Sequence, residues 1–238
     1  NSRSDSLILA TFNKEEKSIK MVSIPRDSKV EIVGKGSMDK ITHAHFFGGM
    51  DMTIATVEHL FEIPVDYYVK LNFQGFVEVI DTLGGITVDV PYTFSESNSK
   101  NVRNAITIEK GRQHLNGEEA LAFARTRKND NDFERGKRQL QVIKAVIDKG
   151  LTFSSVSKYD DVIDSLGENM STNFSLGNII ALSKYSGSIN DIQSLELEGV
   201  DDWSSEGYFY ILDETSVQEV AEELKGHLNL RSPNQIAQ

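Results

Sequence analysis

The start of the chain alternates apolar and polar positions in a way that predicts two β-strands. Residues 6–12 (SLILATF) and 18–24 (SIKMVSI) are separated by the polar segment NKEE, which is the pattern of a β-hairpin. If the turn is centred near residue 15, the residue numbers of two directly opposed positions add up to about 30. Arg3 then opposes Asp27, and Asp5 opposes a residue near Pro25. The sequence therefore predicts that the motifs RSD and PRD meet at one end of this hairpin.

Helical and extended patterns alternate after the hairpin. We expect a loop at 37–49 that leads towards a helix, a helix at 50–61 with its apolar residues on one side, and a strand at 63–72. A helix at 73–83 ends at Gly84-Gly85, and a strand follows at 86–91. Residues 92–108 are polar and form an excursion or a hairpin.

The second half of the chain continues this alternation. Asn116 followed by Glu119 is a capping box that predicts a helix at 115–123. Further helices are expected at 135–150, 175–185 and 216–228, with strands at 195–200 and 208–213. The pattern is typical of the α/β fold class. We expect a single layered domain over residues 1–238, in which helices flank a central mixed β-sheet.

Charge and composition narrow the range of functions. The net charge is −11, and residues 150–238, with fifteen acidic and four basic side chains, carry all of it. An acidic chain argues against general binding of nucleic acid but permits a local anion site. The chain has no cysteine, which excludes disulfides and thiolate metal ligands. It has no apolar run of about 18 residues and no signal peptide, and we expect it to be a fragment whose natural N-terminus is missing.

Four arginines gather in residues 123–141, FARTRKNDNDFERGKRQLQ, within the part of the chain that is neutral overall. Arg135 and Arg138 fall on the same side of the predicted helix as Val142 and Val146. A guanidinium beside an apolar face needs an anionic partner or a water-filled cleft. Its position near a helix N-terminus also favours an anion.

Arg125 and Arg127 share one face if the chain is extended there, about 7 Å apart. A planar guanidinium group can bind two oxygens of one phosphate at once. The four arginines would therefore suit two neighbouring phosphates. The alternative is a structural set of ion pairs with acidic residues of the same stretch, Asp130, Asp132 and Glu134.

Asp5 is the candidate metal ligand. Mg²⁺ is commonly held by one or two carboxylates together with substrate phosphates. The alternative for Asp5 is a local ion pair with Arg3 or Arg26. His43 and His45 lack a third ligand at metal spacing and are expected to pack in the loop or at its rim.

An ordered set of motifs covers residues 1–150: RSDSLILATFN, SIPRDS, KITHAHFFGG, IPVDYYVKLNFQGF, VIDTLGGITVDVP, LNGEEALAFARTR and DFERGKRQLQVI. By these motifs the chain resembles the LytR–CpsA–Psr family of bacterial cell-wall enzymes, and within it the teichoic-acid ligases of Gram-positive bacteria. The resemblance implies an enzyme, a phosphotransferase. It would move an anionic glycopolymer, such as wall teichoic acid, from a polyprenyl-diphosphate carrier to peptidoglycan, forming a phosphodiester.

The resemblance also implies roles for individual residues. Asp5 would help to hold Mg²⁺, and the family's other metal aspartate would lie upstream of Asn1. Asp132 would act on the nucleophile or orient the arginines, with Arg125 and Arg127 counted among the catalytic residues. The pyrophosphate would be bound by Arg3, Arg26, Arg125, Arg127, Arg135, Arg138 and Gln139.

The carrier's lipid tail would need an apolar slot, for which the helix at 73–83 offers Phe73, Phe76, Val77 and Ile80. The alternative is that these four side chains belong to the hydrophobic core and bind no ligand. The family's position implies the outer face of the cytoplasmic membrane, reached through an N-terminal anchor that this sequence lacks.

Two other functions would use the same arginines. A non-catalytic module could capture an anionic polyprenyl-phosphate lipid or polymer without needing Asp5 or Asp132. A pyrophosphatase could hydrolyse the carrier link with water and would need no acceptor groove. Replacing each aspartate by Asn, while binding and turnover are measured separately, separates these functions from the transferase.

Overall fold

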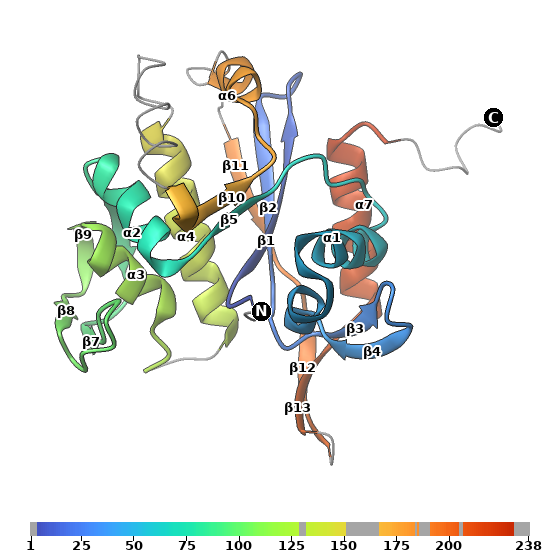
Figure 1. The fold of residues 1–238 in the computed structure, drawn as a ribbon, viewed down its shortest axis with the longest axis horizontal. Helices are drawn as coiled ribbons and strands as arrows, with labels where there is room; N and C mark the ends of the chain where they lie inside the picture. The colour runs from blue at the N-terminus through green and yellow to red at the C-terminus, as the bar shows by residue number, and fades with distance from the viewer. Residues whose placement is uncertain are drawn as a thin grey trace. The chain divides into compact units, whose positions relative to one another are not determined.

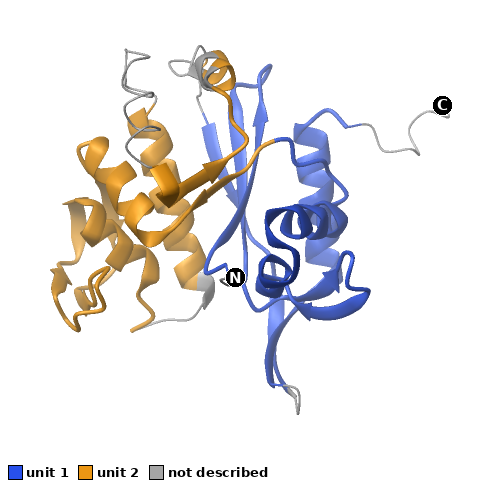
Figure 2. Cartoon of the chain, in the orientation of Figure 1, with its two compact units in different colours: residues 1–66, 190–238 blue, residues 67–189 orange. Residues whose placement is uncertain are grey.

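The computed structural model describes residues 4–128, 132–150, 167–183, 185, 191–204 and 207–230. It confirms a mixed α/β fold, drawn in Figure 1. The chain forms two compact units, which Figure 2 colours separately. Unit 1 contains residues 1–66 and 190–238, and unit 2 contains residues 67–189. No described helix is both long enough and apolar enough to cross a bilayer.

Unit 1 is built on a three-stranded mixed sheet in the order β1-β2-β11. β1 (Leu7–Asn13) pairs antiparallel with β2 (Ser18–Ile24), and β11 (Asp191–Leu195) pairs parallel with β2. Leu7 faces Ile24 and Asn13 faces Ser18, so the residue numbers of opposed positions add up to 31. The register predicted from the sequence is therefore right to within one residue.

The rest of unit 1 adds two hairpins and two helices. Its remaining elements are β3 (Lys29–Ile32), β4 (Ser37–Lys40), α1 (Thr42–Phe61), β12 (Gly199–Ser204), β13 (Gly207–Leu212) and α7 (Glu214–His227). β3 pairs with β4 and β12 pairs with β13, both antiparallel. The core includes Val22, Ile32, Phe61 and Leu224, from the sheet, a hairpin and both helices. Each such buried side chain contributes about 1.5–3 kcal/mol to folding.

Unit 2 has its own core between small two-stranded sheets and helices. Its strands and helices are β5 (Val69–Leu71), α2 (Phe73–Thr82), β6 (Ile86–Val90), β7 (Phe94–Glu96), β8 (Ile106–Ile108), β9 (Gly111–Leu115), α3 (Gly117–Arg125), α4 (Asp132–Gly150), η1 (Gly167–Asn169), β10 (Met170–Thr172) and α6 (Leu176–Ser183). The pairs are β6 with β9, β7 with β8, and β10 with β5, all antiparallel. Ile80, Val88, Phe123 and Val142 are buried together, which brings α2, β6, α3 and α4 into one core.

Three expected elements differ from those observed. The strand predicted at 63–72 is wrong over residues 63–68, where the N–H of Val65 donates to the Glu58 carboxylate (2.8 Å) rather than to another strand. The loop predicted at 37–49 is wrong at both ends, because it contains β4 and the first part of α1. The strand predicted at 195–200 is divided between the end of β11 and the start of β12.

Candidate functional site

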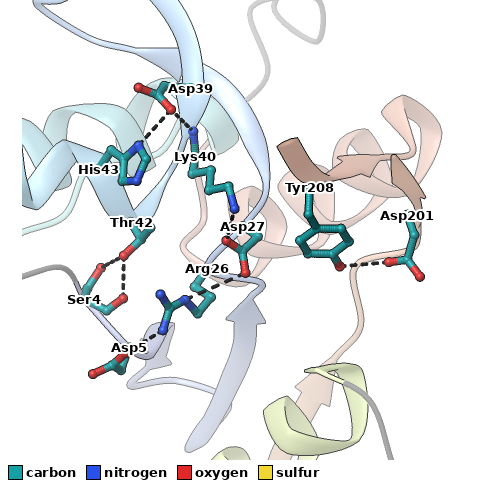
Figure 3. A network of polar contacts seen from close by, with 10 residues as sticks. All are labelled: Ser4, Asp5, Arg26, Asp27, Asp39, Lys40, Thr42, His43, Asp201 and Tyr208. Atoms are coloured by element: carbon teal, nitrogen blue, oxygen red, sulfur yellow. Dashed lines mark hydrogen bonds and ion pairs between the residues drawn. The ribbon is translucent and has the colours of Figure 1, made fainter. Parts of the chain in front are cut away.

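A polar cluster in unit 1 lies where β2 ends, and we call it the Arg26 corner: Asp5, Arg26, Asp27 and Lys40. The N–H of Ser28 donates to the carbonyl of Pro25 (3.0 Å), which turns the chain directly after the strand. Arg26 Nη1 lies 2.5 Å from Asp5 Oδ1, and its Nε lies 3.8 Å from Asp27 Oδ2. The expected meeting of the two motifs is confirmed for Asp5 and Arg26 (Figure 3).

Lys40 connects this corner to the start of α1. Its Nζ donates to Asp27 Oδ1 (2.7 Å), and Asp27 is therefore held between two cations, Arg26 and Lys40. The preceding residue, Asp39, accepts hydrogen bonds from the backbone N–H of Lys40 (2.8 Å) and from Lys35 Nζ (2.7 Å) and contacts His43 Nδ1 (2.8 Å). Partial burial by itself would raise the pKa of Asp39, but these three partners lower it to about 2. Asp39 is thus a fixed negative charge beside the corner.

Sequence reasoning missed Asp39 and Lys40 and placed His43 in a loop. The signal was present in the hairpin β3–β4, where the segment VGKG joins KVEI to SMDK. Gly34 and Gly36 adopt positive φ (84° and 66°) in that turn, a conformation that glycine adopts freely. His43 lies in α1 and contacts a carboxylate. Among the described residues, no three His, Cys, Asp or Glu side chains gather as a metal site.

A second cluster lies in unit 2, where α3 ends, and we call it the Arg125 corner: Phe73, Arg125, Arg138 and Gln139. The predicted capping box at the start of α3 is confirmed, since Asn116 Oδ1 accepts the N–H of Glu119 (3.0 Å) and Glu119 Oε2 accepts the N–H of Asn116 (2.9 Å). The helix continues beyond the predicted residue 123 and ends with Arg125 in its last turn.

Arg125 and Arg127 do not lie on a common extended face. Arg125 is helical and half-buried, Thr126 ends the helix, and Arg127 is exposed. The Arg125 guanidinium carbon lies 4.5 Å from the ring centroid of Phe73, an aromatic contact that suits a cation. The Nη1 of Arg125 is buried and has no hydrogen-bond partner among the described residues.

Arg135 and Arg138 are buried on α4, as the helix pattern predicts, with 8% and 4% of their surfaces exposed. Arg138 donates from Nε to the carbonyl of Phe123 (3.1 Å) and from Nη2 to the carbonyl of Thr126. Gln139 Nε2 donates to the carbonyl of Ala124 (3.3 Å). These donors satisfy carbonyl groups at the end of α3, which helical hydrogen bonds leave unpaired. Arg138 therefore fixes the segment that carries Arg125 and Arg127.

Some candidate residues fall outside what the structure describes. Arg3 lies outside the described residues, as does Asp130. Asp132 begins α4, but its side chain is not described. Glu134, the third acid proposed as an arginine partner, lies 3.7 Å from Lys137 Nζ.

The four residues proposed for a lipid slot lie on α2 but differ in exposure. Val77 and Ile80 are buried, and Ile80 belongs to the core of unit 2. Phe76 is partly buried against the same core. Phe73 is 39% exposed and faces the Arg125 guanidinium. Phe73 is therefore the one of the four whose ring could meet a ligand without opening the core.

The chain matches proteins of known family and structure. The family model "LytR_cpsA_psr family" matches residues 1–226. The chain is 43% identical over 229 residues to "Polyisoprenyl-teichoic acid--peptidoglycan teichoic acid transferase TagT" of Bacillus subtilis (strain 168), a match that covers 96% of this chain and 71% of that protein.

Two solved structures of similar proteins carry ligands. A structure described as "TagT bound to LIIa-WTA" has a TM-score of 0.84 and 41% identity, covering 95% of this chain and 86% of that chain. Another, "LytR-CPS2A-psr family protein YwtF (TagT) with bound octaprenyl pyrophosphate lipid", has a TM-score of 0.78 and 38% identity, covering 96% and 86%.

Proposed function

Because the chain belongs to the LytR–CpsA–Psr family, we propose that it transfers an anionic glycopolymer, wall teichoic acid, from a polyprenyl-diphosphate carrier to peptidoglycan. The similar proteins named as teichoic acid transferases, and those with bound lipid-linked polymer and pyrophosphate lipid, support this activity. We further propose that the enzyme acts at the outer face of the cytoplasmic membrane.

The observation that carries the proposal is that the buried Nη1 of Arg125 has no hydrogen-bond partner in the part of the chain that the structure describes. A buried guanidinium nitrogen without a partner is costly, and a phosphate oxygen would supply the missing acceptor. The adjacent Phe73 ring is partly exposed, so the Arg125 corner offers a hydrogen-bond donor for an anion beside an apolar surface. That combination suits a carrier whose phosphates continue into a hydrocarbon chain.

The proposed reaction is a displacement at phosphorus. A hydroxyl of peptidoglycan attacks the phosphorus that carries the glycopolymer, forming a new P–O bond. The bond from that phosphorus to the bridging oxygen breaks, and polyprenyl phosphate leaves with the electron pair. The product is a phosphodiester, and the hydroxyl proton passes to a base, for which Asp132 is the candidate.

Positive charge is the main contribution of the described residues to the proposed reaction. In unit 2, Arg125 and Arg127 can neutralise phosphate oxygens as charge moves towards the leaving group. Arg26 of unit 1, taken by itself, carries the same kind of charge. Asp27 and Asp5 hold the guanidinium of Arg26 from two directions. A group held in this way loses little freedom when substrate binds, which favours the transition state.

Asp5 is the described residue that would hold Mg²⁺. Its side chain is 59% exposed, and exposed carboxylate oxygen is a ligand type that Mg²⁺ prefers. One protein carboxylate with substrate phosphates and water is an ordinary set of ligands for this ion. When bound, the ion would supply further neutralisation of the diphosphate oxygens. Arg26 would remain beside Asp5 as a second positive charge.

The test is transfer from a polyprenyl-diphosphate-linked glycan to peptidoglycan oligomers, with and without Mg²⁺. We expect product with the native sequence, and a loss of about 10²–10³-fold in kcat/KM for Arg125→Ala and for Asp5→Asn. Arg112→Ala, an exposed arginine on β9, is the matched control and should leave the rate unchanged. Lipid binding without product would favour a binding module. Release of the glycan phosphate into water would favour a pyrophosphatase.

A further inference from the structure

The hairpin β12–β13 carries an aromatic pair in which one ring is largely exposed. Trp203 is 79% exposed, the largest value among the exposed large hydrophobic side chains that the structure describes. It lies directly opposite Tyr208 across the hairpin, with ring centroids 4.8 Å apart. Tryptophan and tyrosine side chains are enriched at binding interfaces, because they combine a large apolar ring with a polar group. Trp203 is also the only tryptophan in the sequence.

Polar groups share this side of the hairpin with the two rings. Because directly opposed residues lie on the same face, Asp201, Trp203, Tyr208 and Tyr210 form one surface, which we call the aromatic face. Tyr208 donates its hydroxyl hydrogen to Asp201 Oδ1 (2.8 Å). The carboxylate of Asp201 is exposed and can accept further hydrogen bonds. The aromatic face therefore combines stacking surface with a hydrogen-bond acceptor.

The aromatic face adjoins the Arg26 corner within unit 1. The N–H of Tyr210 donates to the carbonyl of Asp27 (2.9 Å), and Tyr210 also forms a β-bridge with Ser28. Lys40 Nζ lies 2.7 Å from Asp27 Oδ1 and 5.4 Å from the ring centroid of Tyr208. Figure 3 shows Tyr208 next to this pair and Asp201 beyond it. A molecule stacked on the aromatic face would thus approach Arg26, which is proposed to neutralise phosphate.

We propose that the aromatic face docks a sugar ring of the acceptor glycan strand of peptidoglycan, an inference that rests on the proposed function. A pyranose ring has an apolar C–H surface that stacks on Trp203 and Tyr208, and hydroxyl groups at its edge that donate to Asp201. The donor polymer is a polyanion, and the exposed carboxylate of Asp201 on this face repels it. The acceptor sugar ring is uncharged, which is why the aromatic face suits the acceptor.

A simpler role for the pair is to stabilise the hairpin, since cross-strand aromatic pairs do so. That role accounts for the contact between the rings. It does not require Trp203 to be largely exposed, nor a carboxylate that is hydrogen-bonded to the partner ring. The two roles differ in what they predict for acceptor binding.

Binding is tested first by fluorescence, because all tryptophan emission comes from Trp203. The probe is soluble glycan oligomers of peptidoglycan, added to the protein without donor. We expect a saturable change in emission and protection from acrylamide quenching. Dextran and free teichoic acid are the comparison polymers and should give neither effect. Unchanged emission and quenching at oligomer concentrations that saturate transfer would overturn the proposal.

Kinetics then connect binding to transfer. Trp203→Ala should raise the KM for acceptor by about tenfold, as expected for loss of one stacking contact, and leave the KM for donor unchanged. Trp203→Phe should recover part of this loss. Tyr67→Ala is the control, because Tyr67 is another exposed, stacked aromatic residue.

The outcomes separate the inference from the proposed function. If the native sequence catalyses transfer and Trp203→Ala has an unchanged KM for acceptor, the aromatic face does not bind the acceptor. The proposed function would still hold. Saturable binding of glycan without any transfer contradicts the function and supports the docking surface. Equal losses of donor and acceptor affinity in both Trp203 variants, with a lower melting temperature, would show a purely structural role and overturn the inference.

Discussion

At the scale of single residues, Arg138 shows how a cation can be used to hold backbone. Its nitrogens meet the carbonyls of Phe123 and Thr126, and it is almost fully buried. The sequence predicted that a buried arginine here would need an anionic partner or a water-filled cleft, and the carbonyl oxygens at the end of α3 fill part of that need. The role of Arg138 in pyrophosphate binding remains a prediction, and its structural contacts give it a second, separable effect.

We expect Arg138→Ala to lower the free energy of unfolding by about 2–4 kcal/mol, because it leaves two buried carbonyl groups without donors. Urea denaturation measures this change. Lys137→Ala, an exposed site on the same helix, should change stability by no more than about 0.5 kcal/mol. If Arg138→Ala kept full stability and lost only ligand binding, the structural role would be wrong.

His227 is a second residue whose burial has a measurable consequence. Its Nδ1 lies 2.7 Å from Thr11 Oγ1 and its Nε2 lies 2.8 Å from Ser18 Oγ, which ties the end of α7 to β1 and β2. Burial lowers the pKa of His227 below 6.5, and the charge of Lys20 adds to this effect. Glu16 and Glu223 oppose it by favouring the protonated ring.

The lowered pKa predicts a pH dependence of stability. Below about pH 6.5 the unfolded histidine binds a proton that the folded one does not, so the free energy of unfolding falls as pH falls. The slope cannot exceed about 1.4 kcal/mol per pH unit, the limit for one proton, and it vanishes once pH passes below the folded pKa. Denaturation at several pH values should show this slope, with His227→Gln reducing it and His59→Gln, at an exposed site, leaving it unchanged.

At the scale of elements, α1 is two helical segments joined at a kink. Gly48 (φ −138°, ψ 18°) and Gly49 (φ 66°, ψ −147°) interrupt the helical conformation. The second of these conformations is essentially restricted to glycine. The helix predicted from residue 50 corresponds to the segment after the kink. The segment before it was missed because Ile41 provides no side-chain cap that the sequence could show.

We expect Gly49→Ala to lower the free energy of unfolding by about 1–3 kcal/mol. No atom lies within 4 Å of the added Cβ, so the cost would come from backbone conformation alone. The matched control is Gly226→Ala in α7, which also meets open space but has an ordinary helical backbone. That change should raise stability by about 0.5–1 kcal/mol in thermal or urea unfolding. Equal effects at both sites would contradict the conformational explanation.

The local sequence pattern predicted those strands and helices whose own residues carry a turn, alternation or capping signal. Alternation and the polar NKEE turn predicted β1 and β2 with their register, and the capping box predicted the start of α3. β11 has the sequence DIQSL and was not predicted, because its pairing with β2 depends on residues about 170 positions away. Such pairings have no local signature.

The candidate site was predictable to a different extent in each unit. The register of the first hairpin brought Asp5 to Arg26 from the sequence alone. The pattern of α4 showed that Arg135 and Arg138 face the core, but it could not show that Arg138 binds carbonyls of α3. Phe73 beside Arg125 was also hidden, since it depends on how α2 packs on α3. The roles of these residues in catalysis remain predictions.

At the scale of the whole molecule, the two units have separate cores. The sequence predicted one domain, and that remains a prediction. Unit 2, residues 67–189, is an insertion between the two segments of unit 1. If it unfolded alone, unit 1 would have to close a flexible loop of more than a hundred residues, at an entropic cost on the order of 4 kcal/mol.

We therefore expect a single calorimetric transition, because loss of unit 2 destabilises unit 1. Scanning calorimetry should give a calorimetric enthalpy equal to the van't Hoff enthalpy. Two resolved transitions, or an enthalpy ratio well above one, would show that the units unfold independently and would contradict the single domain.

The parallel pairing of β11 with β2 also affects the order of events during synthesis. β1 and β2 emerge first, but the strand that completes their sheet follows only after the whole of unit 2. Until then the edge of β2 presents unpaired backbone groups that could join a strand of another molecule. A nascent chain of this enzyme is thus exposed to misassembly until β11 has been made.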